Sequence, residues 1–376
     1  MKRYYLIVAV ILAFTFFVNG CVEPFSPPEV NSDEGYLVID GFLNVGSDTS
    51  RIELSHTQNA NATAPVSKES SAAVSVEQEN GITYTFTEAG NGSYFLPPQK
   101  FNTTARYRLR VKTAIGKEYL SDYVEVKNTP PIDNIEGKVD TRQDAMVMQV
   151  NTHDPTNQTR FYRWKFEETW QYRTAFYSSI EIVKKAGGDD YEIVSRKEDV
   201  NLCWRSLKSA NILLGSTIKL SQDVIKDLPL TAVPISSNKL YIKYSILVKQ
   251  YGLTQDAFEY WTSLAKTTEG TGSLFDPLPS QITGNIKNTA NGQELVFGYF
   301  SASVEQKKRI FLTPNLGSFP RCNAPDTLTI ADALKAPGST LTNYFGPRSE
   351  FVLTTSPYCA DCRAQGGTII KPSFWE

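Results

Sequence analysis

Histidine is scarce in this chain, with only His56 and His153 among 376 residues. A hydrolase built on a histidine base would have to use one of these two, and His153 precedes Asp154-Pro155, which is typical of a turn. The common nucleotide, protease, lipase and EF-hand patterns are also missing. Ser263-Leu-Ala-Lys266 has serine–lysine spacing but lacks the companion motifs of acylating enzymes. We therefore predict no catalytic residues and no cofactor.

Basic runs are missing as well. The chain has 38 Lys and Arg against 40 Asp and Glu, and the cations are scattered singly, which is typical of solvated strand faces. This charge balance argues against nucleic acid as a partner. Long stretches with helical charge pairing are absent too, whereas 20 Phe, 19 Tyr and 5 Trp favour a β-rich secreted protein.

One long apolar run exists, and it lies at the N-terminus. Lys2 and Arg3 precede residues 4–18, which carry no charge, and Gly20 stands immediately before Cys21. This pattern predicts a lipoprotein signal peptide over residues 1–20, with Cys21 as the acylated (palmitate-bearing) first residue of the mature chain. An ordinary cleaved leader or an uncleaved anchor are the alternatives, and both leave the position of Cys21 unexplained. The lipid would hold the protein on a membrane outside the cytoplasm.

Residues 21–35 are rich in proline, serine and acidic residues, which predicts a flexible stalk. Short strand patterns then recur over residues 36–129. One of them is a hairpin that turns at Asn80-Gly81. Their regular spacing predicts an antiparallel, immunoglobulin-like β-sandwich that ends at Thr129-Pro130-Pro131.

Residues 132–376 form the second predicted domain, which is larger, β-rich and sandwich-like, with inserted loops and one or two short helices. A long strand is expected over 239–251. Thr254 can cap a helix that runs to about residue 266, with an apolar stripe that includes Ala257 and Trp261. The fold class is therefore mainly β.

The segment 160–173 alternates with a period of two residues. One side of the strand carries the aromatic set Tyr162, Trp164, Phe166, Trp170 and Tyr172. Such a face is expected to pack as core. A ligand-binding surface is the alternative, with Trp164, Trp170 and Tyr172 as the contacts. Glu168 interrupts the face and, if buried, should meet an arginine.

Four cysteines follow Cys21: Cys203, Cys322, Cys359 and Cys362. In an oxidising compartment an even number favours two disulfides, and three connectivities are open. Cys359-Ala-Asp-Cys362 also has the spacing of a zinc knuckle or a redox pair. We expect no metal site, because no second paired spacing supplies further ligands, and a thioredoxin-like pattern is missing.

Several motifs together resemble one family. They are Tyr36-Leu-Val-Ile-Asp-Gly-Phe42, the strand 162–172, Asn201-Leu-Cys-Trp204, Phe258-Glu-Tyr-Trp261, residues 272–300, and Cys359-x-x-Cys362 with the closing Lys371-Pro-Ser-Phe-Trp375. In this order they resemble the domain of unknown function 4249 family, lipoproteins of Bacteroidota outer membranes. Asp326-Thr327-Leu328 is similar to the short O-glycosylation sequon of that phylum, which makes Thr327 a candidate site.

The resemblance implies a genomic context rather than an activity. Such lipoproteins are often encoded beside TonB-dependent receptors, so we expect an outer-membrane lipoprotein that captures or gates an unknown small ligand for such a barrel. A non-catalytic structural or assembly role in the envelope is the alternative. The sequence leaves open whether the protein faces the medium or the periplasm.

Overall fold

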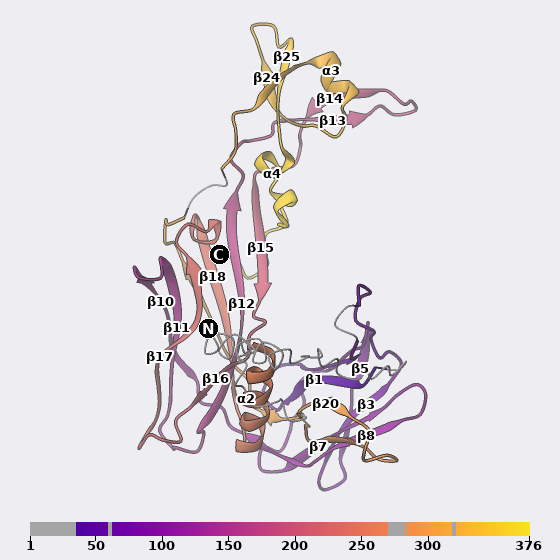
Figure 1. The fold of residues 1–376 in the computed structure, drawn as a ribbon, viewed down its shortest axis with the longest axis vertical. Coiled ribbons are helices and arrows are strands. Elements are labelled where there is room, and N and C mark those ends of the chain that lie inside the picture. Colours follow the sequence, from indigo (N-terminus) through magenta and orange to yellow (C-terminus); the bar gives the residue numbers. More distant parts are fainter. Residues whose placement is uncertain (1–34, 59–61, 270–281, 283, 318–320) are drawn as a thin grey trace, which may run out of the picture. The chain divides into compact units, whose positions relative to one another are not determined.

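The computed structural model describes residues 35–58, 62–269, 282, 284–317 and 321–376. Its first sheet has twelve strands, most of them from residues 37–127 (Figure 1). The strands are β1 (Leu37–Asn44), β2 (Ser50–His56), β3 (Ala73–Gln78), β4 (Thr83–Thr85), β5 (Thr87–Gly90), β6 (Ser93–Leu96), β7 (Arg106–Lys112), β8 (Glu118–Ser121), β9 (Val124–Lys127), β19 (Ile286–Asn288), β20 (Val296–Gly298) and β21 (Ala302–Ser303). Alternate residues of β1, β2, β3 and β7 point into one shared core, so the two halves of this sheet face each other.

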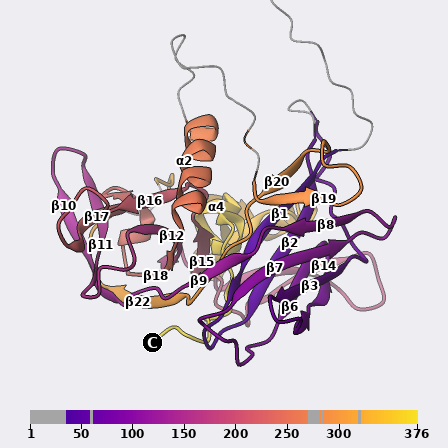
Figure 2. The same ribbon diagram turned by 90° about the horizontal axis from the view of Figure 1, so that it is seen from below.

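The last three strands of this sheet come from far along the chain. β20 and β21 pair parallel to β1, and β19 pairs with β8 (Figure 2). The predicted domain of residues 36–129 is therefore incomplete, and its sheet is not purely antiparallel. Gly298 permits the close approach: its φ is +126°, and a Cβ there would lie 2.1 Å from the carbonyl oxygen of Ile39. Strand patterns show where strands are, but they do not reveal partners this distant.

Two further sheets pack against each other within the second predicted domain, residues 132–376. The first has the order β10-β11-β17, and the second the order β15-β12-β18-β22, with β16 also beside β12. Their bounds are β10 (Ile132–Asp140), β11 (Ala145–Asp154), β12 (Phe161–Arg173), β15 (Leu202–Lys208), β16 (Leu213–Ser216), β17 (Asp223–Pro234), β18 (Lys243–Gly252) and β22 (Gln306–Leu312). The strand expected from residue 239 begins only at Lys243, because η1 (Asn238–Leu240) precedes it.

A helix follows β18 at the predicted place. α2 (Gln255–Glu269) begins after Thr254, whose Oγ1 accepts a hydrogen bond from the Ala257 N–H at 3.2 Å. Ala257 and Trp261 are buried against Leu253 and Tyr299. Within the part of the chain that the structure describes, no helix is long and apolar enough to cross a membrane.

A small lobe beyond the ends of β12 and β15 is made from two segments of the chain (Figure 1). The first is a hairpin between β12 and β15, and the second is a three-stranded sheet, β23-β25-β24, with two short α-helices and one 3₁₀ helix near the C-terminus. They comprise β13 (Ile180–Lys184), β14 (Tyr191–Ser195), β23 (Asp326–Thr329), α3 (Ile330–Lys335), β24 (Thr340–Phe345), β25 (Phe351–Thr355), α4 (Pro357–Ala360) and η2 (Cys362–Gln365). Ile180 of the hairpin and Leu341 and Val352 of the three-stranded sheet are buried in one shared core, so the hairpin and the sheet pack as one unit. The insertions and short helices expected in this domain are present, and the fold is mainly β as predicted.

Candidate functional site

The aromatic face of β12 is core. Trp164 is fully buried, Tyr172 is 1% exposed and Trp170 is 4% exposed. These side chains pack against β11, β17 and β18, and the Trp164 indole N–H donates to Gln250 Oε1 at 2.8 Å. The alternative that Trp164, Trp170 and Tyr172 contact a ligand is therefore wrong, because the second sheet removes them from solvent.

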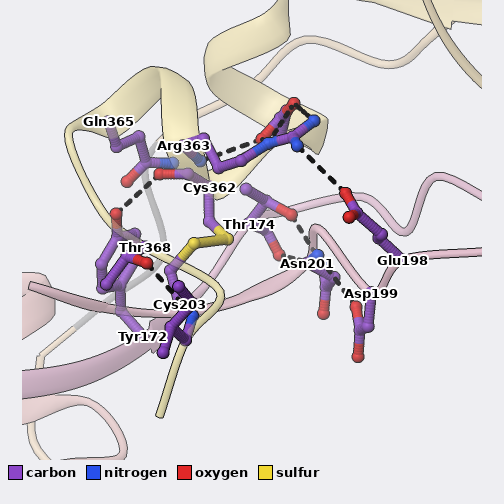
Figure 3. The surroundings of a disulfide bond; sticks show 12 residues. Tyr172, Thr174, Glu198, Asp199, Asn201, Cys203, Cys362, Arg363, Gln365 and Thr368 are labelled. Carbon is purple, nitrogen blue, oxygen red and sulfur yellow. Dashed lines mark hydrogen bonds and ion pairs between the residues drawn. A yellow bond between two sulfur atoms is a disulfide. The ribbon is translucent and has the colours of Figure 1, made fainter. Parts of the chain in front are cut away.

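All four predicted disulfide cysteines are paired. Cys203 on β15 bonds Cys362 (Figure 3). Cys322 bonds Cys359. The two cysteines of the Cys-x-x-Cys motif thus lie on successive short helices and bridge to different partners. Because Cys359 and Cys362 are bonded to different cysteines, they form neither a redox pair with each other nor a pair of free zinc-binding thiolates in the described structure. The Tyr172 hydroxyl also donates to the Cys362 carbonyl oxygen at 2.7 Å, which holds η2 against the end of β12.

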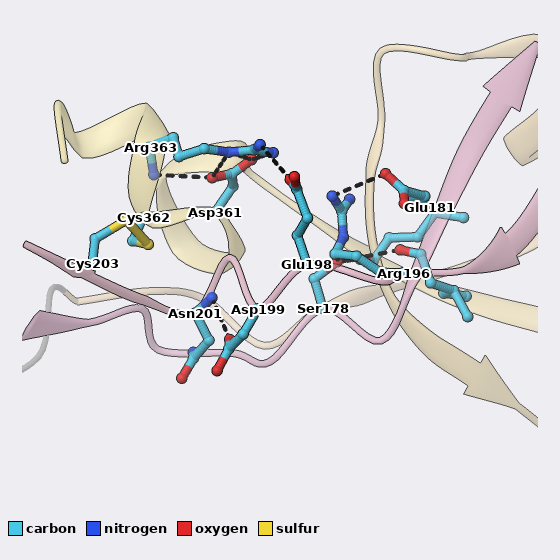
Figure 4. A network of polar contacts seen from close by, with 12 residues as sticks. Ser178, Glu181, Arg196, Glu198, Asp199, Asn201, Cys203, Asp361, Cys362 and Arg363 are labelled. Carbon is cyan, nitrogen blue, oxygen red and sulfur yellow. Dashed lines mark hydrogen bonds and ion pairs between the residues drawn. A yellow bond between two sulfur atoms is a disulfide. The ribbon is translucent and has the colours of Figure 1, made fainter. Parts of the chain in front are cut away.

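Ion pairs surround the same junction (Figure 4). Arg363 contacts Asp361 at 2.7 Å and Glu198 at 3.3 Å, and Arg196 contacts Glu181 at 3.1 Å. Each of these charges has a partner, so this network fastens the C-terminal segment rather than leaving a binding group free. Thr327 is exposed on β23, as a glycosylation site requires. Cys21 lies outside the described residues.

A cleft of about 1070 Å³, part of it open to solvent, runs beside the linker between β9 and β10. Its polar groups bind one another. Asp154 accepts hydrogen bonds from the backbone of Thr156, Gln158 and Thr159, and Lys127 pairs with Glu125 at 3.0 Å. Because these polar groups are satisfied by one another, we do not take this cleft as a candidate ligand site.

A smaller pocket of about 320 Å³, part of it open to solvent, differs in this respect. It lies between β1 and the second sandwich and is lined by Asp40, Gly41, Phe42, Arg163, Lys165, Tyr251, Leu253 and Ser301. The rings of Phe42 and Tyr251 meet edge to face with centroids 4.7 Å apart, which joins the two elements at this point. A few charged groups in a partly aromatic pocket are typical of small-ligand sites.

Arg163 is the unusual member of this pocket. Its Nε is buried without a hydrogen-bond partner, and no carboxylate among the described residues forms an ion pair with it. The guanidinium carbon lies 3.4 Å from the centre of the Trp261 ring on α2. This cation–π contact is worth about 1–2 kcal/mol, less than the cost of several kcal/mol for desolvating a charge. The pocket therefore holds a positive charge that the described residues leave uncompensated.

Further cations continue from Arg163 across the sheet. Lys165, Lys249 and Lys307 stand directly opposite one another on β12, β18 and β22. Like charges in this arrangement repel. Lys307 is neutralised by Asp48 and by Glu305 at 3.0 Å, whereas Lys249 forms no ion pair with a described residue.

Burial and mutual repulsion act on these groups. Burial lowers the pKa of the Arg163 guanidinium, which nevertheless stays charged at neutral pH. Burial also lowers the pKa of Lys165; Asp40, 3.8 Å away, opposes this effect, while Arg163 and Lys249 add to it. Burial raises the pKa of Tyr251, and Glu305, which accepts a hydrogen bond from the Tyr251 hydroxyl at 2.5 Å, acts in the same direction. The pocket is thus a permanent positive centre with one carboxylate at its rim.

Sequence reasoning missed this site. Arg163 and Lys165 belong to the polar side of the β12 alternation, where scattered cations predict a solvated face. For Arg163 this interpretation is wrong, because Trp261 covers its guanidinium. The available signal was the pair of cations Arg163 and Lys165, two residues apart on a strand rich in aromatics. The pocket also requires β1 and α2, and the alternation of residues along β12 does not predict where these elements lie.

These observations describe a class: a β-rich protein with two disulfides and a charged pocket. The family model described as "Domain of unknown function (DUF4249)" matches residues 22–309. The chain therefore belongs to this family, as the sequence motifs predicted. A comparison with curated proteins finds no match.

Among solved structures, the chain is similar to part of "Chitinase ChiA74 from Bacillus thuringiensis", at 10% identity and a TM-score of 0.16. The similar region covers 56% of this chain and 30% of the chitinase, so it spans less than a third of that protein. A TM-score this low carries no argument about fold or activity.

Proposed function

We propose that this protein is an outer-membrane lipoprotein that captures a small ligand for a TonB-dependent receptor. The pocket around Arg163 carries the proposal. A protein that captures a ligand needs a concave site with aromatic walls and a few polar groups, and Phe42, Tyr251 and Arg163 provide these elements. A scaffolding role would be better supported by a broad, flat apolar patch.

An uncompensated charge at this position is explained if a bound ligand neutralises it. A buried guanidinium without a partner lowers the stability of the folded chain, so a purely structural protein gains nothing from it. A bound anion would supply the missing acceptors and restore the lost solvation energy. This favours capture over the alternative of a structural envelope protein.

A lipid on Cys21 would strengthen such a partnership. Confinement of both proteins to one membrane raises their effective concentration, so that even a weak contact with the barrel would suffice for pairing. Cys21→Ala should abolish labelling by a fatty-acid probe, and labelling that persists would refute the anchor.

Affinity purification of the tagged full-length chain from mildly solubilised outer membranes tests the proposal. Mass spectrometry is expected to find a stoichiometric TonB-dependent receptor with the wild-type chain. The Cys21→Ala chain is the matched control and should recover less receptor. Recovery of the wild-type chain alone would overturn the receptor partnership.

A further inference from the structure

We propose that the pocket binds the carboxylate of a small ligand, with Arg163 and Lys165 as the binding groups. This inference rests on the proposed capture function and defines the chemical class of its ligand. The buried Nε of Arg163 has no partner, and a planar guanidinium matches a carboxylate through two parallel hydrogen bonds. Trp261 covers one face of the guanidinium, which leaves its edge for the ligand.

The charges that line the pocket favour a single negative charge. Arg163 and Lys165 are the cations, and Asp40 is the one carboxylate of the lining, 3.8 Å from the Lys165 ammonium. The balance is one positive charge, which one carboxylate neutralises. Inorganic phosphate carries more than one negative charge at neutral pH, so it exceeds this balance and is repelled more strongly by Asp40.

The dimensions of the site also favour a carboxylate. The volume of about 320 Å³ includes space that is open to solvent and the enclosed part is much smaller, so only a head group enters beside Phe42 and Tyr251, whose rings contact each other. Gly41 forms part of the wall, and its φ of +152° with a Cβ position only 2.3 Å from the Arg51 carbonyl oxygen excludes a larger residue there. The remainder of the ligand would extend toward the row of Lys165, Lys249 and Lys307, where Lys249 is unpaired among the described residues.

Acetate is the smallest probe of this head group, with acetamide as its neutral counterpart and inorganic phosphate as the competing anion. The full-length chain in dodecyl maltoside is titrated at constant ionic strength. The signal is the indole N–H resonance of Trp261, which is assigned with Trp261→Phe. We expect a saturable shift with acetate, none with acetamide, and at least tenfold weaker binding of phosphate.

Variants then locate the site. Arg163→Met should abolish the acetate shift, and Lys165→Met, at a side chain that is 40% exposed, should weaken binding several-fold. Arg309→Met is the matched control and should bind acetate as the wild type does, because Arg309 lies on β22 outside the pocket and contacts Ser245 and Phe374. Melting curves of all variants verify that each one folds.

Asp40→Asn provides a test that misfolding would not imitate. Removal of the rim carboxylate should strengthen acetate binding several-fold and admit phosphate. Acetate binding that survives Arg163→Met, phosphate that outcompetes acetate in the wild type, or a wild type that does not bind acetate would each overturn the carboxylate assignment. The receptor purification tests the proposed receptor partnership separately. A receptor can be recovered with a chain that does not bind acetate, and a chain that binds acetate can be recovered without a receptor.

Discussion

Glu168 shows how one residue is accommodated in an apolar core. Its side chain is 4% exposed, and it accepts hydrogen bonds from Lys239 Nζ at 2.7 Å and from the Tyr244 hydroxyl at 2.8 Å. The expected arginine partner is thus a lysine, supplied by the short helix before β18. Burial and the nearby Glu168 carboxylate raise the pKa of Tyr244, which remains a hydrogen-bond donor.

Lys239→Met should lower the free energy of unfolding by about 3 kcal/mol, because it leaves the buried Glu168 charge with one donor. Urea denaturation measures this loss. Glu168→Leu combined with Lys239→Met should restore most of the stability, since apolar groups of similar volume replace both charges. A double variant as unstable as the single one would contradict this account.

His153 should respond to pH in a defined direction. Its Nδ1 lies 2.7 Å from Asp133 Oδ2, and this hydrogen bond, with the charge of Asp133, raises the pKa of the imidazole above its ordinary value. The stabilisation is therefore complete below the ordinary pKa of about 6.5 and is lost as pH rises through the higher folded value. An NMR titration should find a lower pKa for His153 in the Asp133→Asn variant than in the wild type. Equal values would exclude the contact.

At the scale of elements, β12 has two faces with different environments. Tyr162, Trp164 and Tyr172 on one face form the core between two sheets. Arg163 and Lys165 on the other face line the pocket against β1. The period of two residues in one strand thus places the core residues and the pocket residues on opposite sides of the same backbone.

Trp164→Ala should lower the free energy of unfolding by about 3–5 kcal/mol, because it opens a cavity and leaves Gln250 Oε1 without its indole donor. Thermal or urea unfolding measures the change. Tyr177→Ala is a suitable control, since Tyr177 is 60% exposed and its replacement should change stability by less than about 0.5 kcal/mol. Equal effects of the two substitutions would show that the β12 face is not core.

At the scale of the whole molecule, two covalent links fasten the end of the chain. Cys203–Cys362 closes a sequence separation of 159 residues and Cys322–Cys359 one of 37. Chain-entropy arguments give the longer loop roughly 5 kcal/mol and the shorter one roughly 4 kcal/mol of stabilisation. The C-terminal segment is therefore an integral part of the second sandwich.

Peptide mapping without reduction should find Cys203 joined to Cys362 and Cys322 joined to Cys359. Replacing both Cys203 and Cys362 by serine should lower the free energy of unfolding by about 3–5 kcal/mol, and the same change at Cys322 and Cys359 by somewhat less. The detection of a peptide that joins Cys359 to Cys362 would exclude the arrangement described above.

Local sequence patterns were sufficient to predict several elements of this fold. Alternation identified β12 and its aromatic core face, Asn80-Gly81 located the hairpin of β3 and β4, and Thr254 marked the start of α2. The even number of cysteines favoured two disulfides, and ordered motifs identified the family. Each of these signals depends on neighbouring residues or on composition, which are directly readable in a sequence.

Tertiary structure alone decided the rest. It joined β20 and β21 to β1 across more than 250 residues, selected one of three disulfide pairings, and gave Glu168 a lysine. It also covered Arg163 with Trp261 and closed a pocket around it with Phe42. The physical reason is common to all of these: period and propensity determine which way a side chain faces, whereas the identity of what it meets depends on contacts between segments far apart in the chain.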